Sequence, residues 1–497
     1  MLGTYTTFPE LLILVPMLAG VICFFLGKNN AAKNVALFAS IVTLCISLAS
    51  LCYADDKFAK YNTVSYIWLK YIGSTYLVGL DATGRMLTLL TAIGFPLIFV
   101  ATYKNDYKNS ASFYGLMLLT QAGLMGVFCA MDALVFYFYW ELALIPVYFL
   151  SSKWGGEKRI QATFKFFVYT FAGSLLMLVG IIYVYLHTPG RVFEDGTTTA
   201  HSFSINAFYQ AKLAVSEQAW VFWLFFLAFA IKMPIFPFHT WQPDAYDQSP
   251  TPVTMVLSGI MVKMGLFGVM RWLIPIFPDA TKQYAHLVMV LSIIGIIYAS
   301  CIAIKQDNLK KLVAYSSIAH IGLMCAAIFA MNAVSVQGVL LQMFNHGINI
   351  IGLWIVVDQL EKKTGVKEIS RLGGVAHKAP VLTILLVIIA LANIALPLTN
   401  AFVGEFMMFA GVWQYNHWYA AIAGISIILA AVYTLNMIQK VFYGETNTLT
   451  ASIRDIALHE KVILAVIVVC IFMMGVYPQP MIDLTKNAVT ILLRVGQ

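Results

Sequence analysis

Long apolar runs, rather than alternating apolar and polar positions, dominate the chain. A helix needs about 20 mostly apolar residues to cross the hydrocarbon core of a bilayer. Fourteen such segments are predicted as membrane spans: 9–27, 31–53, 84–103, 112–130, 131–151, 162–187, 219–238, 251–274, 283–304, 309–330, 335–357, 379–400, 417–440 and 460–477. The shorter and more polar stretch 480–495 predicts an amphipathic helix or tail at the surface.

Proline interrupts two of the predicted spans. AIKMPIFPFHTWQPD contains Pro234 and Pro237, and NIALPLTNAFVGEF contains Pro397. Proline lacks an amide donor and clashes with the carbonyl four residues earlier. The carbonyls of Ala230 and Met233 should therefore be free. Such breaks are tolerated in a membrane where they are buried or line a hydrated cavity.

The two breaks lie five spans apart, so a tandem five-helix unit would be repeated with inverted topology. Paired broken helices indicate a transport site, although prolines can also fall in membrane helices by chance. We therefore expect an all-α polytopic membrane protein with two inverted five-helix repeats, each with one broken helix. The expected parts are a three-helix segment (1–111), a first repeat (112–274), a second repeat (275–443), and a final helix with an amphipathic tail (444–497).

Composition agrees with a membrane protein. Hydrophobic residues make up 60% of the chain and charged residues 11%, against about 25% charged in a typical soluble domain. These values exclude a soluble enzyme, a disordered chain and a coiled coil. With both termini outside, 19 of the 31 lysines and arginines fall in inner loops. This bias predicts a multi-pass membrane protein with both termini on the outer side.

Four ionisable residues lie inside the predicted spans: Glu141, Lys232, Lys263 and Glu405. A charge at the bilayer centre costs about 2.5–3.5 kcal/mol, so each must pair, hydrate or change protonation. Glu141 is the expected charge partner of Lys232, and a static buried ion pair is the alternative. Lys263 lies too deep in its span to snorkel to the interface.

Glu405 and two histidines extend this set. By repeat arithmetic, Glu405 should occupy the place that Lys232 holds in the first repeat, or else cap the second half-helix. His320 and His346 lie on neighbouring spans, and an imidazole can pass a proton between its two nitrogens. His239, which follows the first break, could instead bond the freed carbonyls. The sequence predicts a hydrated file running through Glu141, Lys232, Lys263, His320, His346 and Glu405.

Cofactor motifs are absent from the sequence. No dinucleotide fingerprint, phosphate-binding loop or iron–sulfur cysteine cluster occurs, and no two of the seven cysteines form a C-x-x-C pair. Any redox or nucleotide chemistry must therefore belong to another chain.

Several segments make the chain resemble the antiporter-like membrane subunits of respiratory complex I, which are related to subunits of multisubunit Na+/H+ antiporters. The matching segments are GLDATG (79–84), FYWELALIPVYFL (138–150), AIKMPIFPFHTWQPDAY (230–246), PTPVTMVLSGIMVKMG (250–265), QDNLKKLVAYSSIAHIG (306–322) and FNHGINI (344–350). Within that family, FVGEF and the lack of a long C-terminal lateral helix separate this chain from the L type.

The resemblance implies a proton-translocating subunit of an H+-translocating NADH:quinone reductase. It assigns the same six residues to the proton path. NADH, FMN, iron–sulfur clusters and quinone would belong to partner subunits, and the neighbours would be antiporter-like subunits of the L and N types. Two alternatives are a subunit of a multisubunit Na+/H+ antiporter, against which FVGEF argues, and a purely structural subunit with locked ion pairs.

Overall fold

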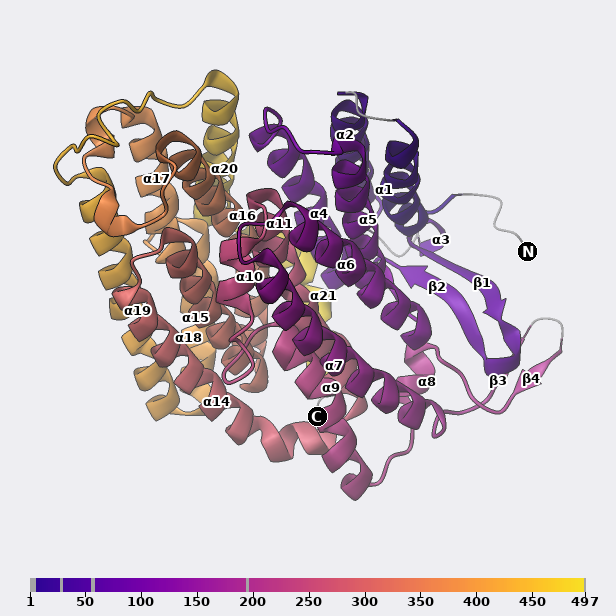
Figure 1. Ribbon diagram of the computed structural model, residues 1–497. Helices are drawn as coiled ribbons and strands as arrows, with labels where there is room; N and C mark the ends of the chain where they lie inside the picture. Colours follow the sequence, from indigo (N-terminus) through magenta and orange to yellow (C-terminus); the bar gives the residue numbers. More distant parts are fainter. Residues whose placement is uncertain (1–5, 27–29, 55–58, 194–195, 496–497) are drawn as a thin grey trace.

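Membrane-length helices form most of the computed structural model, which describes residues 6–26, 30–54, 59–193 and 196–495 (Figure 1). Within these residues, thirteen helical segments are long and apolar enough to cross a membrane. They are α1 (Phe8–Phe25), α2 (Ala31–Cys52), α4 (Ala82–Ala101), α5 (Ser110–Cys129), α6 (Ala133–Trp154), α7 (Arg159–Tyr185), α9 (Val215–Lys232), α11 to α13 (Thr251–Ile276), α14 (Pro278–Lys305), α15 (Leu309–Phe329), α16 (Ala333–Thr364), α19 with η7 (His417–Phe442) and α20 (Leu458–Val476).

The fourteenth predicted span corresponds to a broken helix. The shorter helix α17 (Pro380–Asn393) ends before the proline, and α18 (Asn400–Tyr415) continues after it. Likewise, α9 ends at Lys232 and a short helix, α10 (Gln242–Gln248), follows the first break. The expected polytopic helical fold and both expected helix breaks are confirmed.

The span Thr251–Ile276 carries irregular turns that the sequence pattern did not predict. Its parts are α11 (Thr251–Val256), a π-helical turn η3 (Leu257–Met261), α12 (Lys263–Gly268), a second π-helical turn η4 (Val269–Leu273) and α13 (Ile274–Ile276). A π turn adds one residue to a helical turn and is common at functional sites. It leaves the apolar pattern unbroken, so hydropathy alone cannot reveal it.

Small strands and turns lie in the connections between the helices. The strand β1 (Thr63–Leu69) pairs antiparallel with β2 (Ser74–Gly79), so that Thr63 faces Gly79. The predicted spans did not anticipate these strands, because each is too short and too polar to register as a membrane segment. The remaining elements are α3 (Ala59–Asn62), η2 (Lys70–Ile72), β3 (Arg191–Val192), β4 (Thr198–Thr199), α8 (Ile205–Tyr209), η5 (Ile369–Arg371), η6 (Val375–His377) and η7 (Ile438–Phe442).

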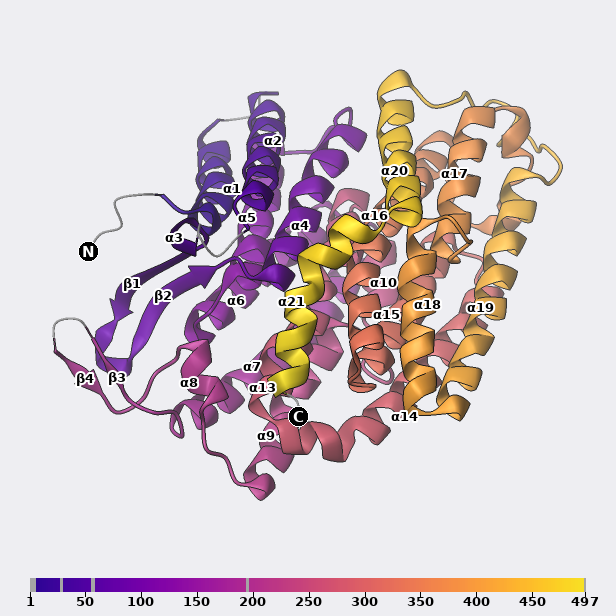
Figure 2. The same cartoon turned by 180° about the vertical axis from the view of Figure 1, so that it is seen from behind.

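Helix α16 is the central element of the second half of the chain. It has 32 residues and packs against α15, α17, α18, α20 and α4. The predicted amphipathic tail is helix α21 (Gln479–Val495), which crosses the bundle and contacts α16 and α4 (Figure 2). A hydrogen bond of 2.7 Å from Gln337 Nε2 to Thr485 Oγ1 joins α21 to α16. The core around α16 therefore brings together elements from both halves of the chain.

Candidate proton path

Lys263 lies at the centre of the bundle and is fully buried, with 0% exposure. Its ammonium donates to the backbone carbonyl of Ser258 at 2.9 Å and lies 2.8 Å from His346 Nδ1. Because Ser258 belongs to the π turn, that irregular turn supplies the carbonyl that the ammonium reaches. The ammonium does not snorkel to the interface, since the whole side chain is buried in the protein interior.

A glycine contact brings the helices of Lys263 and His346 together. A Cβ at Gly347 would lie 2.9 Å from the backbone oxygen of Gly259, and a Cβ at Gly259 would lie 2.8 Å from Ile351. Any side chain at either glycine would push α16 away from the π turn. The adjacent residue His346 therefore comes within hydrogen-bonding distance of Lys263.

The two histidines and Glu405 continue the path from Lys263. The rings of His346 and His320 have centroids 5.6 Å apart. His320 Nδ1 lies 3.0 Å from Glu405 Oε1, and both side chains are almost fully buried. The structure therefore places Lys263, His346, His320 and Glu405 in one row. The predicted order of the two histidines is wrong, because His346 lies next to Lys263 and His320 lies next to Glu405.

The position of Glu405 corrects two sequence-based expectations. Glu405 is the sixth residue of α18, whose N-cap is Thr399, so its carboxylate does not cap the half-helix. Lys232 is the last residue before its own break. Lys232 precedes the first break, whereas Glu405 follows the second break. The two residues therefore do not hold equivalent places along their broken helices.

Polar side chains of α16 hold the half-helix α18 in place. Gln342 Nε2 donates to Glu405 Oε1 at 3.1 Å, and Asn345 Nδ2 donates to the backbone oxygen of Asn400 at 2.8 Å. The side-chain amides of Asn349 and Asn400 donate to each other, both at 3.0 Å. These bonds satisfy backbone and side-chain groups that the break would leave buried without partners.

Glu141 and Lys232 are not in direct contact. Lys232 is 2% exposed, and neither its Nζ nor Glu141 Oε1 has a hydrogen-bond partner. In the described part of the chain no ion pair links the two, and the Lys232 ammonium lies 5.5 Å from the ring centre of Trp140. The alternative of a static buried ion pair is therefore wrong, because no ion pair or hydrogen bond joins the carboxylate and the ammonium.

In the part of the chain that the structure describes, no hydrogen bond joins His239 to the backbone carbonyl of Ala230 or Met233, the two that the first break was predicted to free. The backbone oxygen of Ala230 accepts from the Ile235 amide at 3.1 Å, and that of Ile231 accepts from the Trp241 indole at 3.0 Å. The imidazole of His239 is 3% exposed and its Nδ1 has no partner. The ring packs instead against Phe236, with centroids 5.9 Å apart.

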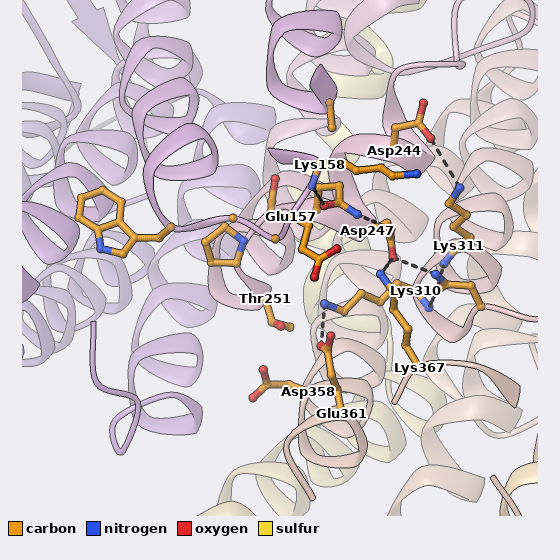
Figure 3. Close-up of a pocket in the computed structure, with 18 of the residues that line it drawn as sticks. Glu157, Lys158, Asp244, Asp247, Thr251, Lys310, Lys311, Asp358, Glu361 and Lys367 are labelled. Atoms are coloured by element: carbon orange, nitrogen blue, oxygen red, sulfur yellow. Dashed lines mark hydrogen bonds and ion pairs between the residues drawn. The ribbon is translucent and has the colours of Figure 1, made fainter. Parts of the chain in front are cut away.

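A charged cavity of about 1160 Å³ opens on the face that the lysine bias predicts to be the inner one (Figure 3). Salt bridges cross it, including Lys165 to Asp244 at 2.9 Å, Lys310 to Glu361 at 2.6 Å and Lys367 to Asp247 at 2.6 Å. From the sequence alone, these lysines are expected only to set the orientation of the chain in the membrane. The acidic residues that pair with these lysines lie far away in the sequence, so no local sequence pattern indicated the cavity.

Hydrogen bonding and ion pairing lower the pKa of Asp247 in this cavity. Burial acts to raise the pKa of Asp247, but hydrogen bonds from Lys367 and Asn308 outweigh burial, so the pKa is lowered. Asp247 therefore stays ionised at neutral pH and keeps its link to Lys367. Because the pKa of Asp247 is lower in the folded chain than in the unfolded chain, its ionised carboxylate stabilises the fold at pH values above the unfolded pKa. This stabilisation is lost as the pH falls through the pKa of the folded chain.

A smaller cavity of about 430 Å³ lies near the opposite ends of the helices, beside α21. Arg271 forms an ion pair with Asp81 there, and Arg85 donates to backbone carbonyls of Ser50 and Leu80. The predicted orientation places both arginines on the outer side of the membrane. In the structure both are buried at helix ends. Among the described residues, no group of three or more His, Cys, Asp or Glu side chains could hold a metal ion.

Glycine at position 404 permits the close contact of α18 with α16 and leads to a first prediction. A Cβ there would lie 3.0 Å from Gln342 Cβ and 3.1 Å from the Gln342 backbone nitrogen. Gly404→Ala should separate the helices, lengthen the Gln342–Glu405 bond and destabilise the chain by about 1–3 kcal/mol. We expect a lower melting temperature of the purified protein and a severalfold loss of proton pumping.

Gly424→Ala on α19 is the matched control, because a Cβ there has no neighbour within 4 Å. This variant should melt and pump as the unmodified protein does. Equal behaviour of the two alanine variants would contradict the role given to the contact between α16 and α18.

Comparisons with known proteins agree with this geometry. Residues 130–430 match the family model described as NADH:quinone oxidoreductase/Mrp antiporter, TM. NADH-quinone oxidoreductase subunit M of Rickettsia prowazekii (strain Madrid E) is 34% identical over 480 residues, covering 95% of each chain. F(420)H(2) dehydrogenase subunit M of Methanosarcina mazei is 32% identical and covers 96% of each chain. A chain in the structure of respiratory complex I from Thermus thermophilus with bound NADH superposes with a TM-score of 0.87 at 28% identity, covering 97% of this chain and 99% of that one.

Proposed function

Because the chain belongs to the NADH:quinone oxidoreductase/Mrp antiporter membrane family, we propose that it is a proton-translocating membrane subunit of an NADH:quinone oxidoreductase, of the M type. The single observation that carries this proposal is the row Lys263–His346–His320–Glu405. Each member can gain or lose a proton, and the row runs through a membrane interior where isolated charges are costly. A purely structural subunit has no need of such a row.

In this proposal the protons move by short transfers between neighbouring groups. The Lys263 ammonium donates to His346 Nδ1, which lies 2.8 Å away. The opposite nitrogen of His346, Nε2, is buried without a partner and can release a proton toward His320. His320 then donates from Nδ1 to the carboxylate of Glu405 at 3.0 Å.

Glu141 and Lys232 form the input side of the same proposal. Because the two groups are held apart within the first repeat, either can change its charge without breaking a direct ion pair. An ammonium on Lys232 would repel a second ammonium on Lys263 and favour release of its proton. We propose that charge changes at Glu141 and Lys232 alternate with proton uptake and release by Lys263.

The energy for transport must come from outside this chain. Moving one charge against the membrane potential costs about 2.3 kcal/mol per 100 mV. We propose that NADH, FMN, iron–sulfur clusters and quinone lie in partner subunits, and that antiporter-like neighbours of the L and N types transmit the drive. We also propose a bacterial inner membrane as the location, from the similarity to bacterial relatives. We propose that both termini lie on the periplasmic side, from the distribution of lysine and arginine.

A second candidate function is proton translocation in a complex that takes its electrons from F420H2 instead of NADH. The relative from Methanosarcina mazei is named as a subunit of F(420)H(2) dehydrogenase and is 32% identical. An F420H2-driven complex would use the same row of residues. The Na+/H+ antiporter alternative is less well supported, because FVGEF places a glutamate at the second break and the relative at 34% identity is an oxidoreductase subunit.

Purification with the native partners tests the proposed function. An affinity-tagged chain, expressed in its own cells and extracted in mild detergent, should copurify with NADH-oxidising subunits and with NADH:quinone reductase activity. Copurification with F420H2-oxidising subunits would support the second candidate. Isolation with antiporter subunits and no redox activity would overturn the proposal.

A further inference from the structure

The side of His320 that faces away from Glu405 has its own set of partners. Asn393 Nδ2 lies 3.5 Å from His320 Nε2 and 3.2 Å from Ser316 Oγ, and Ser316 Oγ also accepts from the Tyr433 hydroxyl at 2.9 Å. All of these side chains are buried. Asn393 is the last residue of α17, directly at the second helix break.

The orientation of the Asn393 amide determines which nitrogen of His320 can carry the proton. An amide nitrogen can only donate, so His320 Nε2 must be the unprotonated acceptor. The imidazole proton then lies on Nδ1, directed at Glu405 Oε1. With the amide in this orientation, the Nδ1 proton of the imidazole lies on the side of the carboxylate.

The same residues can also bond the doubly protonated imidazolium form of His320, once the Asn393 amide has turned. When the Asn393 amide turns by half a rotation, its oxygen faces Nε2 and can accept from the imidazolium. The Ser316 hydroxyl can then donate to that oxygen while still accepting from Tyr433. Asparagine can do this because its two amide atoms have nearly the same shape and opposite hydrogen-bonding roles.

We propose that Asn393 is a positioning residue that matches its amide orientation to the charge of His320, so that this histidine can both take up and release a proton. This inference rests on the proposed function. The position of Asn393 at the end of α17 also links the charge of His320 to the geometry of the helix break. A cavity of about 20 Å³ beside His320 and Glu405 has room for one water that could exchange a proton with them.

The charged groups around His320 are few. Among the elements packed against α15, α16 contributes His346, α18 contributes Glu405 and α19 contributes Tyr433. Helix α14 contributes only Ser300 to the cavity. Helix α10 contacts α15 nearer its beginning, where Asp244 pairs with Lys311 at 3.7 Å.

Two substitutions at Asn393 should move the pH dependence of pumping in opposite directions. Asn393→Asp places an acceptor permanently at His320 Nε2, stabilises the imidazolium and should shift the optimum to higher pH. Asn393→Leu keeps the size, removes both bonds and should shift the optimum to lower pH. We expect each shift to be about one pH unit, measured as NADH-driven pumping by the assembled complex in inverted vesicles.

Thr383→Val is the matched control, because Thr383 is buried on the same helix and bonds only the backbone oxygen of Ala379, at 2.9 Å. Its pH profile should not move. If an Asn393 variant fails to assemble, Ser316→Ala replaces it. This variant removes the second partner of the turned amide oxygen, and it should shift the optimum in the same direction as Asn393→Leu.

An unchanged profile in the assembled Asn393 variants, or in Ser316→Ala where it replaces one of them, would overturn this inference. Equal losses at every pH in both Asn393 variants would also overturn it and reduce Asn393 to a structural role. Either result leaves the proposed proton translocation intact, since that fails only when variants of Lys263 or Glu405 pump normally.

Discussion

Replacing Lys263 by methionine is expected to reduce NADH-driven proton pumping by about a hundredfold, within the range attributed to a positioned acid–base group. Methionine fills a similar volume but cannot carry a proton to His346. Folding should survive, because replacing a buried charge with an apolar side chain is often neutral for stability. Pumping is read from dye quenching in inverted vesicles, with the amount of assembled complex measured in the same membranes.

Lys33→Met is the control for this variant. Lys33 is also a buried lysine, at 7% exposure, but its partner Asp106 lies at the surface, and the pair joins α2 to the connection between α4 and α5. Pumping by this control should stay close to that of the unmodified complex. Normal pumping by an assembled Lys263→Met complex would remove Lys263 from the path.

Glu405→Gln is expected to lower pumping by at least about tenfold, equivalent to about 1.4 kcal/mol. The glutamine keeps the shape and can still accept from Gln342 and His320. It cannot take up the proton that His320 releases, so transfer should stop at the histidine. The rate of NADH oxidation should fall with pumping when electron transfer and proton transfer are tightly coupled.

Glu10→Gln is the matched control for Glu405→Gln. Glu10 is a buried glutamate of α1 that accepts from the Thr7 amide at 2.8 Å and from the Tyr66 hydroxyl at 2.6 Å, outside the proposed path. Its substitution should leave pumping nearly unchanged. If Glu405→Gln behaves like this control, Glu405 is not a proton acceptor.

Much of the fold was accessible from the sequence, because apolar runs and prolines report directly on membrane helices. The breaks near Pro234 and Pro397 and the amphipathic tail were predicted at the right places. The π turn before Lys263 was not, since it changes hydrogen bonding without changing the apolar pattern. The two short hairpins also lacked a signal strong enough to stand out from loops.

The site was predicted in part. Lys263, His320, His346 and Glu405 were predicted to share one path, and the structure places them side by side. Their positions on successive spans gave the wrong order for the two histidines, because chain order does not determine which side chain reaches Lys263. The lack of direct contact between Glu141 and Lys232 could not be predicted, since the separation of the two side chains depends on how far apart their helices pack. Asn393 was missed as well, because a lone asparagine at a helix end carries no signal until its neighbours are known.

The central claim is that Lys263 and Glu405 act on the same protons, in series. The most direct test is the pumping rate of a complex that carries both Lys263→Arg and Glu405→Asp, compared with each single variant at equal amounts of assembled complex. Residues that act as a unit show strongly non-additive losses. The account predicts that the double variant pumps no more slowly than the more impaired single variant. A loss equal to the product of the two single losses would show independent contributions and would contradict a shared path.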